Sequence, residues 1–449
     1  MLKKTLLFTT GLIIVFLSST LTRVDRTPYK KLDFYKKSIN EINQLLTKNH
    51  SPSIGDTLLI GFAQVNLTPS DLAPLAGYGN RRPKEMTGVH DSIYVNTTVI
   101  YNGKNKIAIV SADLLIIPPQ VTALLREKLF NTAWSVPEVF LSATHTHSSL
   151  GGWAPGLVGN MIAGTYDAKY PEFIANRIVA SIQMAEKRLN TGAWSFNELS
   201  IPSLINNRLV GTQGITDPNL KLMALKSGMK EGVHVFYGAH ATCLSGKNKQ
   251  MSRDYPGVFS DWVVNNTPLD FAVYSAGAVA SMGPETGARA GFDRSQFIGE
   301  EMAKQVALIQ HFGFSYQNQL NLSFLRIPLF LRHPMLKISE NWAVRPWVFN
   351  WAFGHSPLEI SMIQLNDLVM IGLPCDFSGE LAVELYAYAK SKNLNLILSS
   401  FNGGYAGYVP DDQWYDLEEY EPRSMSWYGY DNGAYFVEII KLLIDYSQP

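Results

Sequence analysis

Short apolar runs that alternate with helix-forming segments constrain the fold of this 449-residue chain more than any other feature. The runs lie at 106–117, 138–144, 232–239, 271–277, 367–374 and 394–401. They are nearly continuous and rich in β-branched and aromatic residues, which is typical of strands in a sheet covered on both faces. Helical spacing of apolar residues recurs between them, at 119–130, 170–189 and 378–392. We therefore expect an α/β fold, a layered sandwich of mixed β-sheets flanked by helices.

Charge and cysteine content exclude several classes of protein. Lysine plus arginine and aspartate plus glutamate both number 38, so no strong net field favours nucleic acid as a partner. The only cysteines, Cys243 and Cys375, cannot make a disulfide framework, although both a single bridge and two packed free thiols fit the sequence. The composition is that of an ordinary globular protein and indicates no particular oligomeric state.

The first 24 residues differ from the rest of the chain. A basic start, Met1-Leu-Lys-Lys, precedes the apolar stretch TLLFTTGLIIVFLSSTLT, and Arg23 and Arg26 follow it. This order is typical of a signal peptide or a signal anchor, and the stretch is nearly long enough to span a membrane. It contains neither an Ala-x-Ala cleavage site nor a lipid-accepting cysteine. We expect an exported protein, either anchored by this segment or released as a secreted or periplasmic protein.

A connecting region follows at residues 25–55. Apolar residues of 31–47 recur at helical spacing and predict an amphipathic helix, and Asn49-His-Ser-Pro-Ser-Ile-Gly-Asp is typical of a linker. We expect one large domain from Asp56 to residue 449.

Two histidines end the apolar run 138–144. In an extended segment the side chains of residues i and i+2 share a face, so Thr-His-Thr-His presents His145 and His147 on one side. Other runs end in the same way: 232–239 is followed by His240, 367–374 by Asp376, and 394–401 by Tyr405 and Tyr408. Ligands of α/β sheets bind at the carboxyl ends of strands. The pattern indicates one convergent site.

Two histidines and a carboxylate are a usual zinc donor set. Zinc lowers the pKa of a bound water to about 7, and a tyrosine could complete the ligand set or donate to a developing oxyanion. Simpler roles exist for each residue. His240 fits a hydrogen-bonded core histidine, Tyr408 fits loop packing, and Asp376 fits the N-terminus of a helix with Ser378 and Glu380 in its first turn.

Longer segments resemble the neutral/alkaline non-lysosomal ceramidases, zinc amidases that split ceramide into sphingosine and a fatty acid. THTHSSLGG at 144–152 is similar to the family's THTHSGPGG, and similarity continues at 60–69, 236–257 and 405–429. It covers roughly residues 56–445, which implies that 56–449 is a catalytic domain. The family usually continues into a C-terminal immunoglobulin-like domain, whereas this chain ends after the helix-like segment 437–447.

The resemblance implies one zinc ion per chain with His145, His240, Asp376 and Tyr408 as ligands. The family has glutamate at the position of Asp376. His147 matches a histidine beside the metal. Arg208 and Tyr420 match polar residues expected to orient substrate and to stabilise negative charge in the tetrahedral intermediate.

The family's active-site serine has no direct counterpart. Alignment on the glycine of SAGAVASMGPE, 275–285, places Ala280 at its position and Ser281 one residue later. Either a one-residue shift lets Ser281 take its role, or the role is absent. We favour attack by zinc-activated water over a serine acyl-enzyme.

The implied function is hydrolysis of the N-acyl amide bond of a ceramide-like sphingolipid, to a sphingoid base and a fatty acid, with the lipid substrate met at a membrane surface. Two alternatives fit the same residues. One is hydrolysis of another N-acyl lipid or ester on the same zinc site. The other is a membrane-tethered protein that binds lipid without turnover, which Ala280 favours.

Overall fold

The computed structural model describes residues 5, 9, 17–48, 53–82, 84–130, 132–135 and 138–447. Most of the predicted export segment, residues 1–24, lies outside the described residues. No helix in the described ranges is both long and apolar enough to cross a membrane. Cys243 and Cys375 are buried free thiols, so the unbridged alternative is the one observed.

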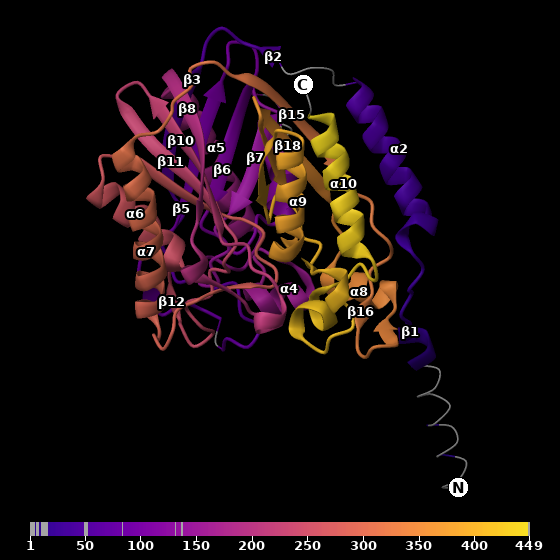
Figure 1. Ribbon diagram of the computed structural model, residues 1–449. Coiled ribbons are helices and arrows are strands. Elements are labelled where there is room, and N and C mark those ends of the chain that lie inside the picture. Colours follow the sequence, from indigo (N-terminus) through magenta and orange to yellow (C-terminus); the bar gives the residue numbers. More distant parts are fainter. Residues whose placement is uncertain are drawn as a thin grey trace.

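Two sheets form the centre of the fold (Figure 1). The larger has eight strands in the order β13-β11-β10-β8-β3-β5-β6-β7, and the smaller has five in the order β2-β15-β18-β19-β21. Both are mixed, because the pairs β6–β7, β11–β13 and β19–β21 are parallel and the other pairs are antiparallel. The strands of the larger sheet are β3 (Leu59–Asn66), β5 (Tyr94–Tyr101), β6 (Lys106–Ala112), β7 (Val139–Ala143), β8 (Asn190–Ser200), β10 (Asn219–Ser227), β11 (Lys230–Tyr237) and β13 (Phe271–Ala276). Those of the smaller sheet are β2 (Ser53–Ile54), β15 (Asn321–Pro328), β18 (Glu359–Leu365), β19 (Leu368–Gly372) and β21 (Asn395–Ser399).

Strand β6 shows why the fold is layered. Ile107 and Ile109 point into a core shared with the smaller sheet, where Met370 and Ile397 pack against them. Ala108 and Val110 alternate with these two isoleucines of β6 and point to the opposite face of the strand. They belong to a second core, on the outer face of the larger sheet. A strand buried on both faces needs apolar residues at every position, which explains the continuous run in the sequence.

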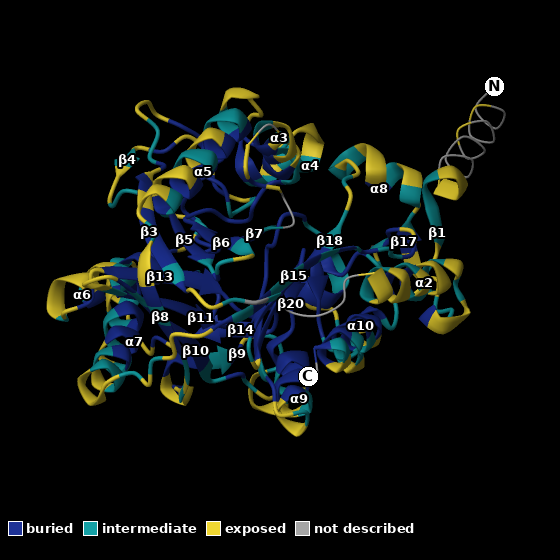
Figure 2. Ribbon diagram, turned by 90° about the horizontal axis from the view of Figure 1, so that it is seen from above, coloured by how far each residue is buried: buried dark blue, intermediate teal, exposed yellow. Residues whose placement is uncertain are grey.

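Helices cover the outer faces of the two sheets. α3 (Pro119–Leu129) and α5 (Lys169–Lys187) cover one part of the larger sheet, and α6 (Asp254–Asn266) and α7 (Phe292–Phe312) cover the other. α9 (Gly379–Ser391) and α10 (Asn432–Tyr446) cover the smaller sheet. Figure 2 shows the buried sheets between helices whose outer faces are exposed. The predicted layered α/β architecture is therefore observed.

The connecting region packs on this domain. α2 (Asp33–Lys48) lies where the sequence predicts an amphipathic helix, at 31–47. Its Ile42 is buried in the core under α9 and α10. The segment predicted to be a linker, 49–56, contains β2, which pairs with β15. Leu21–Arg23 forms β1, which pairs with β17 (Trp342–Val344), and β17 in turn pairs with β16 (Leu336–Lys337).

The remaining described strands form short pairs, and the one labelled in Figure 1, β12, lies below the larger sheet in that view. They are β4 (Gly88–Val89) with β12 (Gln250–Met251), β9 (Ile205–Asn207) with β14 (Met282–Pro284), and β20 (Asp376–Phe377) with β22 (Tyr408–Val409). Two short helices, α4 (Gly156–Ala163) and α8 (Pro346–Phe353), lie in the same region.

The packing of α2 predicts a stability effect. Ile42→Ala should lower the free energy of unfolding by roughly 2–5 kcal/mol, because truncation leaves a cavity in the core shared with α9 and α10. Lys36→Ala, on the exposed side of the same helix, is the matched control and should change it by less than about 0.5 kcal/mol. Urea denaturation followed by circular dichroism measures both. Equal stability of the two variants would show that α2 does not pack as described.

Candidate functional site

The predicted site residues meet at one edge of both sheets. His145 and His147 follow β7, and His240 follows β11 of the larger sheet. Asp376 and Tyr408 come from the region of the smaller sheet, where the parallel pairing of β20 and β22 sets them directly opposite each other. His145 has a left-handed backbone, with φ of 60°, so the chain turns sharply as it leaves β7. The expected convergence is thus observed.

The side chains of these residues lie within a few ångströms of one another. The Nε2 atoms of His145 and His147 are 3.1 Å apart, and the ligand atoms of these two and of His240 all lie within 4.8 Å. Asp376 Oδ1 is 3.5 Å from His145 Nε2 and 3.2 Å from His240 Nε2. The Tyr408 hydroxyl is 3.1 Å from His240 Nε2.

Backbone carbonyls determine which nitrogen of each imidazole carries the proton. His145 Nδ1 lies 2.7 Å from the Leu115 carbonyl oxygen, and His240 Nδ1 lies 2.7 Å from that of Val279. His147 Nδ1 lies 3.2 Å from the Gly77 carbonyl oxygen. Because a carbonyl oxygen only accepts, each Nδ1 donates, and each neutral ring directs an Nε2 lone pair toward the centre.

Burial keeps these rings neutral. It lowers the pKa of His145 to about 3, although the nearby Asp376 carboxylate acts in the opposite direction. Burial likewise lowers the pKa of His147 and of His240 well below the ordinary value. Burial raises the pKa of Asp376, against the effects of His145 and of the Tyr405 hydrogen bond.

The cluster has the features of a cation site. Three Nε2 lone pairs and a fully buried carboxylate face one another, and Asp376 Oδ1 has no hydrogen-bond donor of its own. Acceptors packed this closely repel one another unless a positive group lies between them. Arg208 supplies part of that charge, with Nη2 3.0 Å from His240 Nε2. The nitrogen and oxygen donor set fits a metal of the zinc type.

Tyr405 positions the shorter carboxylate at residue 376. Its hydroxyl donates to Asp376 Oδ2 at 2.8 Å, which leaves Oδ1 to face the histidines. The backbone N–H of Asp376 donates to the Gly407 carbonyl at 3.0 Å, so the two segments are joined beside the site. In the sequence, Tyr405 stands out only as a residue that follows a predicted strand.

Glu421 is a residue of the candidate site that the sequence did not single out. It is buried, and its Oε1 accepts from Arg208 Nε at 2.8 Å, while its Oε2 accepts from the backbone N–H of Ser281 at 2.8 Å. Burial alone would lower the pKa of the Arg208 guanidinium. The nearby Glu421 and Tyr408 have the larger combined effect and raise that pKa. The signals in the sequence were its place beside Tyr420 and within the family-like segment 405–429.

The remaining two predicted residues lie at the margins of the cluster. The Tyr420 ring is 6.1 Å from that of Tyr408, and its side chain is largely exposed to solvent. Ser281 is fully buried with φ of 65°, and its carbonyl accepts from the Arg208 backbone N–H at 2.8 Å. Ser281 is absent from the described residues that line the adjoining cavity.

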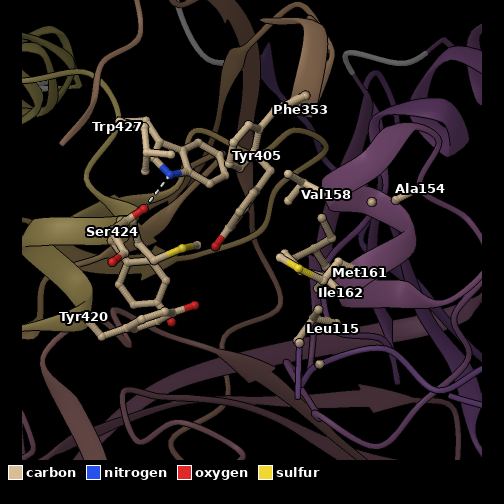
Figure 3. A pocket seen from close by; sticks show the side chains of 18 of the residues that line it. Leu115, Ala154, Val158, Met161, Ile162, Phe353, Tyr405, Tyr420, Ser424 and Trp427 are labelled. Carbon is tan, nitrogen blue, oxygen red and sulfur yellow. Dashed lines mark hydrogen bonds between the residues drawn. The ribbon is translucent and has the colours of Figure 1, made fainter. Parts of the chain in front are cut away.

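A cavity of about 1080 Å³ opens onto the cluster. His145, His147, Arg208 and Tyr408 lie along it, and most of its other walls are apolar (Figure 3). In Figure 3, Leu115, Val158, Met161 and Ile162 lie on one side, and Phe353, Tyr405, Tyr420 and Trp427 on the other. Such a space suits a molecule with a long apolar part and one polar group at the histidines.

Comparison with known proteins confirms the resemblance found in the sequence. Residues 59–280 match the sequence model of the family described as neutral/alkaline non-lysosomal ceramidase, N-terminal. A curated relative, the neutral ceramidase of Pseudomonas aeruginosa, is 26% identical over 204 residues. That match covers 41% of this chain and 30% of the relative, so the matched part spans less than a third of the relative's length.

Solved structures confirm the fold. The crystal structure of neutral ceramidase from Pseudomonas aeruginosa superposes with a TM-score of 0.74 at 19% identity, over 88% of this chain and 75% of that one. A structure described as ceramidase complexed with C2 gives a TM-score of 0.75 at 18% identity over the same shares.

The pairing of Glu421 with Arg208 predicts a change in metal affinity. Glu421→Gln should weaken zinc binding roughly 10- to 100-fold, because the guanidinium beside His240 loses its counter-charge. Competition with a zinc-sensitive dye measures the affinity. Glu418→Gln, an exposed change three residues away, is the control and should leave the affinity unchanged. If both variants bind zinc like the parent, Glu421 has no part in the site.

Proposed function

We propose that this chain, which belongs through residues 59–280 to the neutral/alkaline non-lysosomal ceramidase family, is a zinc-dependent amidohydrolase. Its substrate would be a ceramide-like sphingolipid, whose N-acyl amide bond is cleaved to give a sphingoid base and a fatty acid. One observation carries the proposal. Three unprotonated Nε2 atoms and the Asp376 carboxylate converge where a large apolar cavity ends.

His145, His240, Asp376 and Tyr408 are the ligands that we propose for one zinc ion per chain. When bound there, zinc supplies a Lewis acid for the amide carbonyl and lowers the pKa of water to about 7. The wholly buried positions of His240 and Asp376 suit ligands. His147, which like His145 and Tyr408 borders the cavity, is the histidine that we leave available to substrate.

His147 is suited to move the protons of the reaction. Its neutral Nε2 can accept a proton from the attacking water, while Nδ1 stays bonded to the Gly77 carbonyl. The imidazolium can then deliver that proton to the leaving amine nitrogen as the carbon–nitrogen bond breaks. Asp376 is less suited to this role, because one of its oxygens accepts from Tyr405 and the other faces the proposed ion.

Arg208 and Tyr420 are suited to stabilise the negative charge that develops on the carbonyl oxygen. Glu421 holds the guanidinium in place, so Arg208 need not reorganise during the reaction. Tyr420 offers a phenolic hydroxyl along the same cavity. Ser281 does not line the cavity, which supports direct attack by water rather than formation of an acyl-enzyme on serine.

The proposed chain organisation follows the sequence. Residues 1–24 would be an export signal or anchor, 25–55 an amphipathic helix and linker, and 56–449 the catalytic domain. Export would place the enzyme outside the cytoplasm, either membrane-anchored or in secreted or periplasmic form.

His147→Ala should lower kcat/KM for the N-acyl substrate by roughly 10²- to 10⁴-fold, because the proton acceptor is lost. Its zinc content should stay near that of the parent. His145→Ala should lose both zinc and activity. His311→Ala, an exposed histidine on α7, is the matched control and should change neither. Elemental analysis and steady-state kinetics provide the two measurements.

A substrate panel tests the function itself. Ceramides, other N-acyl lipids and lipid esters are incubated with the zinc-loaded parent, and free fatty acid is measured. Preference for ceramides supports the proposal. Preference for another N-acyl lipid or ester would reassign the substrate on the same site. A folded, zinc-loaded chain that turns over none of them would contradict hydrolysis and favour a lipid-binding protein.

A further inference from the structure

Two helices that line the cavity carry no charged residue. α4 has the sequence GLVGNMIA and α8 has PWVFNWAF. The two helices contact each other, and Figure 2 shows them side by side with exposed outer faces. Val158 and Ile162 of α4 and Phe349 and Phe353 of α8 line the cavity.

The outer faces of these helices are also largely apolar, with Asn160 and Asn350 as their exposed polar residues. Trp347 and Trp351, four residues apart on α8, are 57% and 70% exposed, and Leu157 on α4 is 62% exposed. A helix that is apolar on every side is normally buried in protein or in a membrane. Ile338 and Trp342, exposed next to α8 in the β16–β17 hairpin, extend the patch. We define the apolar rim as Leu157, Met161, Ile338, Trp342, Trp347 and Trp351.

Tryptophan is distributed unevenly over the surface. The chain has nine tryptophans, and the exposed ones are Trp342, Trp347 and Trp351. All three lie on the apolar rim. The indole ring favours the membrane–water interface, because it is large and apolar but carries one N–H donor.

The N-terminal chain meets the domain at the apolar rim. The Arg345 backbone N–H donates to the Thr20 carbonyl at 2.8 Å, and Trp347 Nε1 donates to the Ser19 carbonyl at 2.9 Å. The preceding sequence, TLLFTTGLIIVFLSS at 5–19, is the apolar stretch predicted to enter or cross a membrane. The described end of this stretch, at Ser19 and Thr20, therefore lies against α8 at the apolar rim.

We propose that the apolar rim docks the domain on a lipid bilayer, with the indoles of Trp347 and Trp351 at the boundary between headgroups and acyl chains. The exposed Arg345 and Arg23 suit the phosphates of lipid headgroups, and the Arg23 guanidinium lies 4.8 Å over the Trp342 ring. Large apolar side chains that are exposed together in this way mark an interaction surface.

Docking in this orientation would place the cavity against the layer that holds its substrate. Because α4 and α8 form both the rim and the cavity wall, a lipid leaving the bilayer would enter between apolar side chains without crossing water. This part of the inference rests on the proposed function, whereas bilayer contact by the rim does not.

Tryptophan quenching tests the docking on the full chain. Phosphatidylcholine vesicles with brominated acyl chains should quench the parent fluorescence, and Trp347→Phe/Trp351→Phe should reduce that quenching at least twofold. Trp262→Phe, a half-buried tryptophan on α6, is the matched control and should leave the quenching unchanged. The apolar N-terminal stretch carries no tryptophan, so it cannot produce the signal itself.

Two results would overturn the proposal. One is a parent whose fluorescence is not quenched by the vesicles. The other is a folded double phenylalanine variant, checked by circular dichroism, that is quenched as strongly as the parent.

Kinetics separate this inference from the proposed function. Trp347→Ala/Trp351→Ala should lower turnover of an N-acyl lipid in vesicles by roughly tenfold and leave turnover of a monomeric short-chain analogue unchanged. Equal loss on both substrates would contradict docking. If the parent hydrolyses neither, the proposed function fails, while the quenching result still decides whether the rim contacts the bilayer.

Discussion

Three backbone carbonyls determine the chemistry available at the centre of this molecule. Each accepts the Nδ1–H of one histidine, and the three Nε2 lone pairs are thereby directed to one point beside Asp376. Two of these carbonyls, Leu115 and Val279, follow β6 and β13, the parallel neighbours of the strands that deliver the histidines. The sheet register therefore sets which ring nitrogen carries the proton, and it leaves three lone pairs that could hold a metal ion.

The layers of the fold were largely readable from the sequence. Runs such as 106–117 are apolar at every position because β6 is buried on both faces, and β6, β7, β11, β13, β19 and β21 all lie within or beside predicted runs. β8 and α7 were not predicted. β8 mixes polar and apolar residues, since much of it is only half-buried, and α7 has a weak apolar stripe among charged residues. Tertiary contacts, not local pattern, determine both.

The sequence predicted the site as a group of residues that follow the ends of strands, and these residues lie close together in the structure. The residues that hold them in place could not be predicted in the same way. Glu421 stabilises Arg208 from 213 residues away, and no local spacing connects the two. Tyr405 is one of many tyrosines in the sequence, and only the structure shows that its hydroxyl donates to Asp376. For Ser281, the sequence left two readings, and the cavity lining favours the one in which the serine does not react.

We propose above that one zinc ion binds to His145, His240, Asp376 and Tyr408. The most direct measurement is anomalous X-ray diffraction from crystals of the zinc-loaded chain, recorded just above and just below the zinc absorption edge. We expect one strong peak per chain that appears only above the edge, within bonding distance of His145 Nε2, His240 Nε2 and Asp376. A map with no peak among these residues, or with its only peak elsewhere, would contradict it.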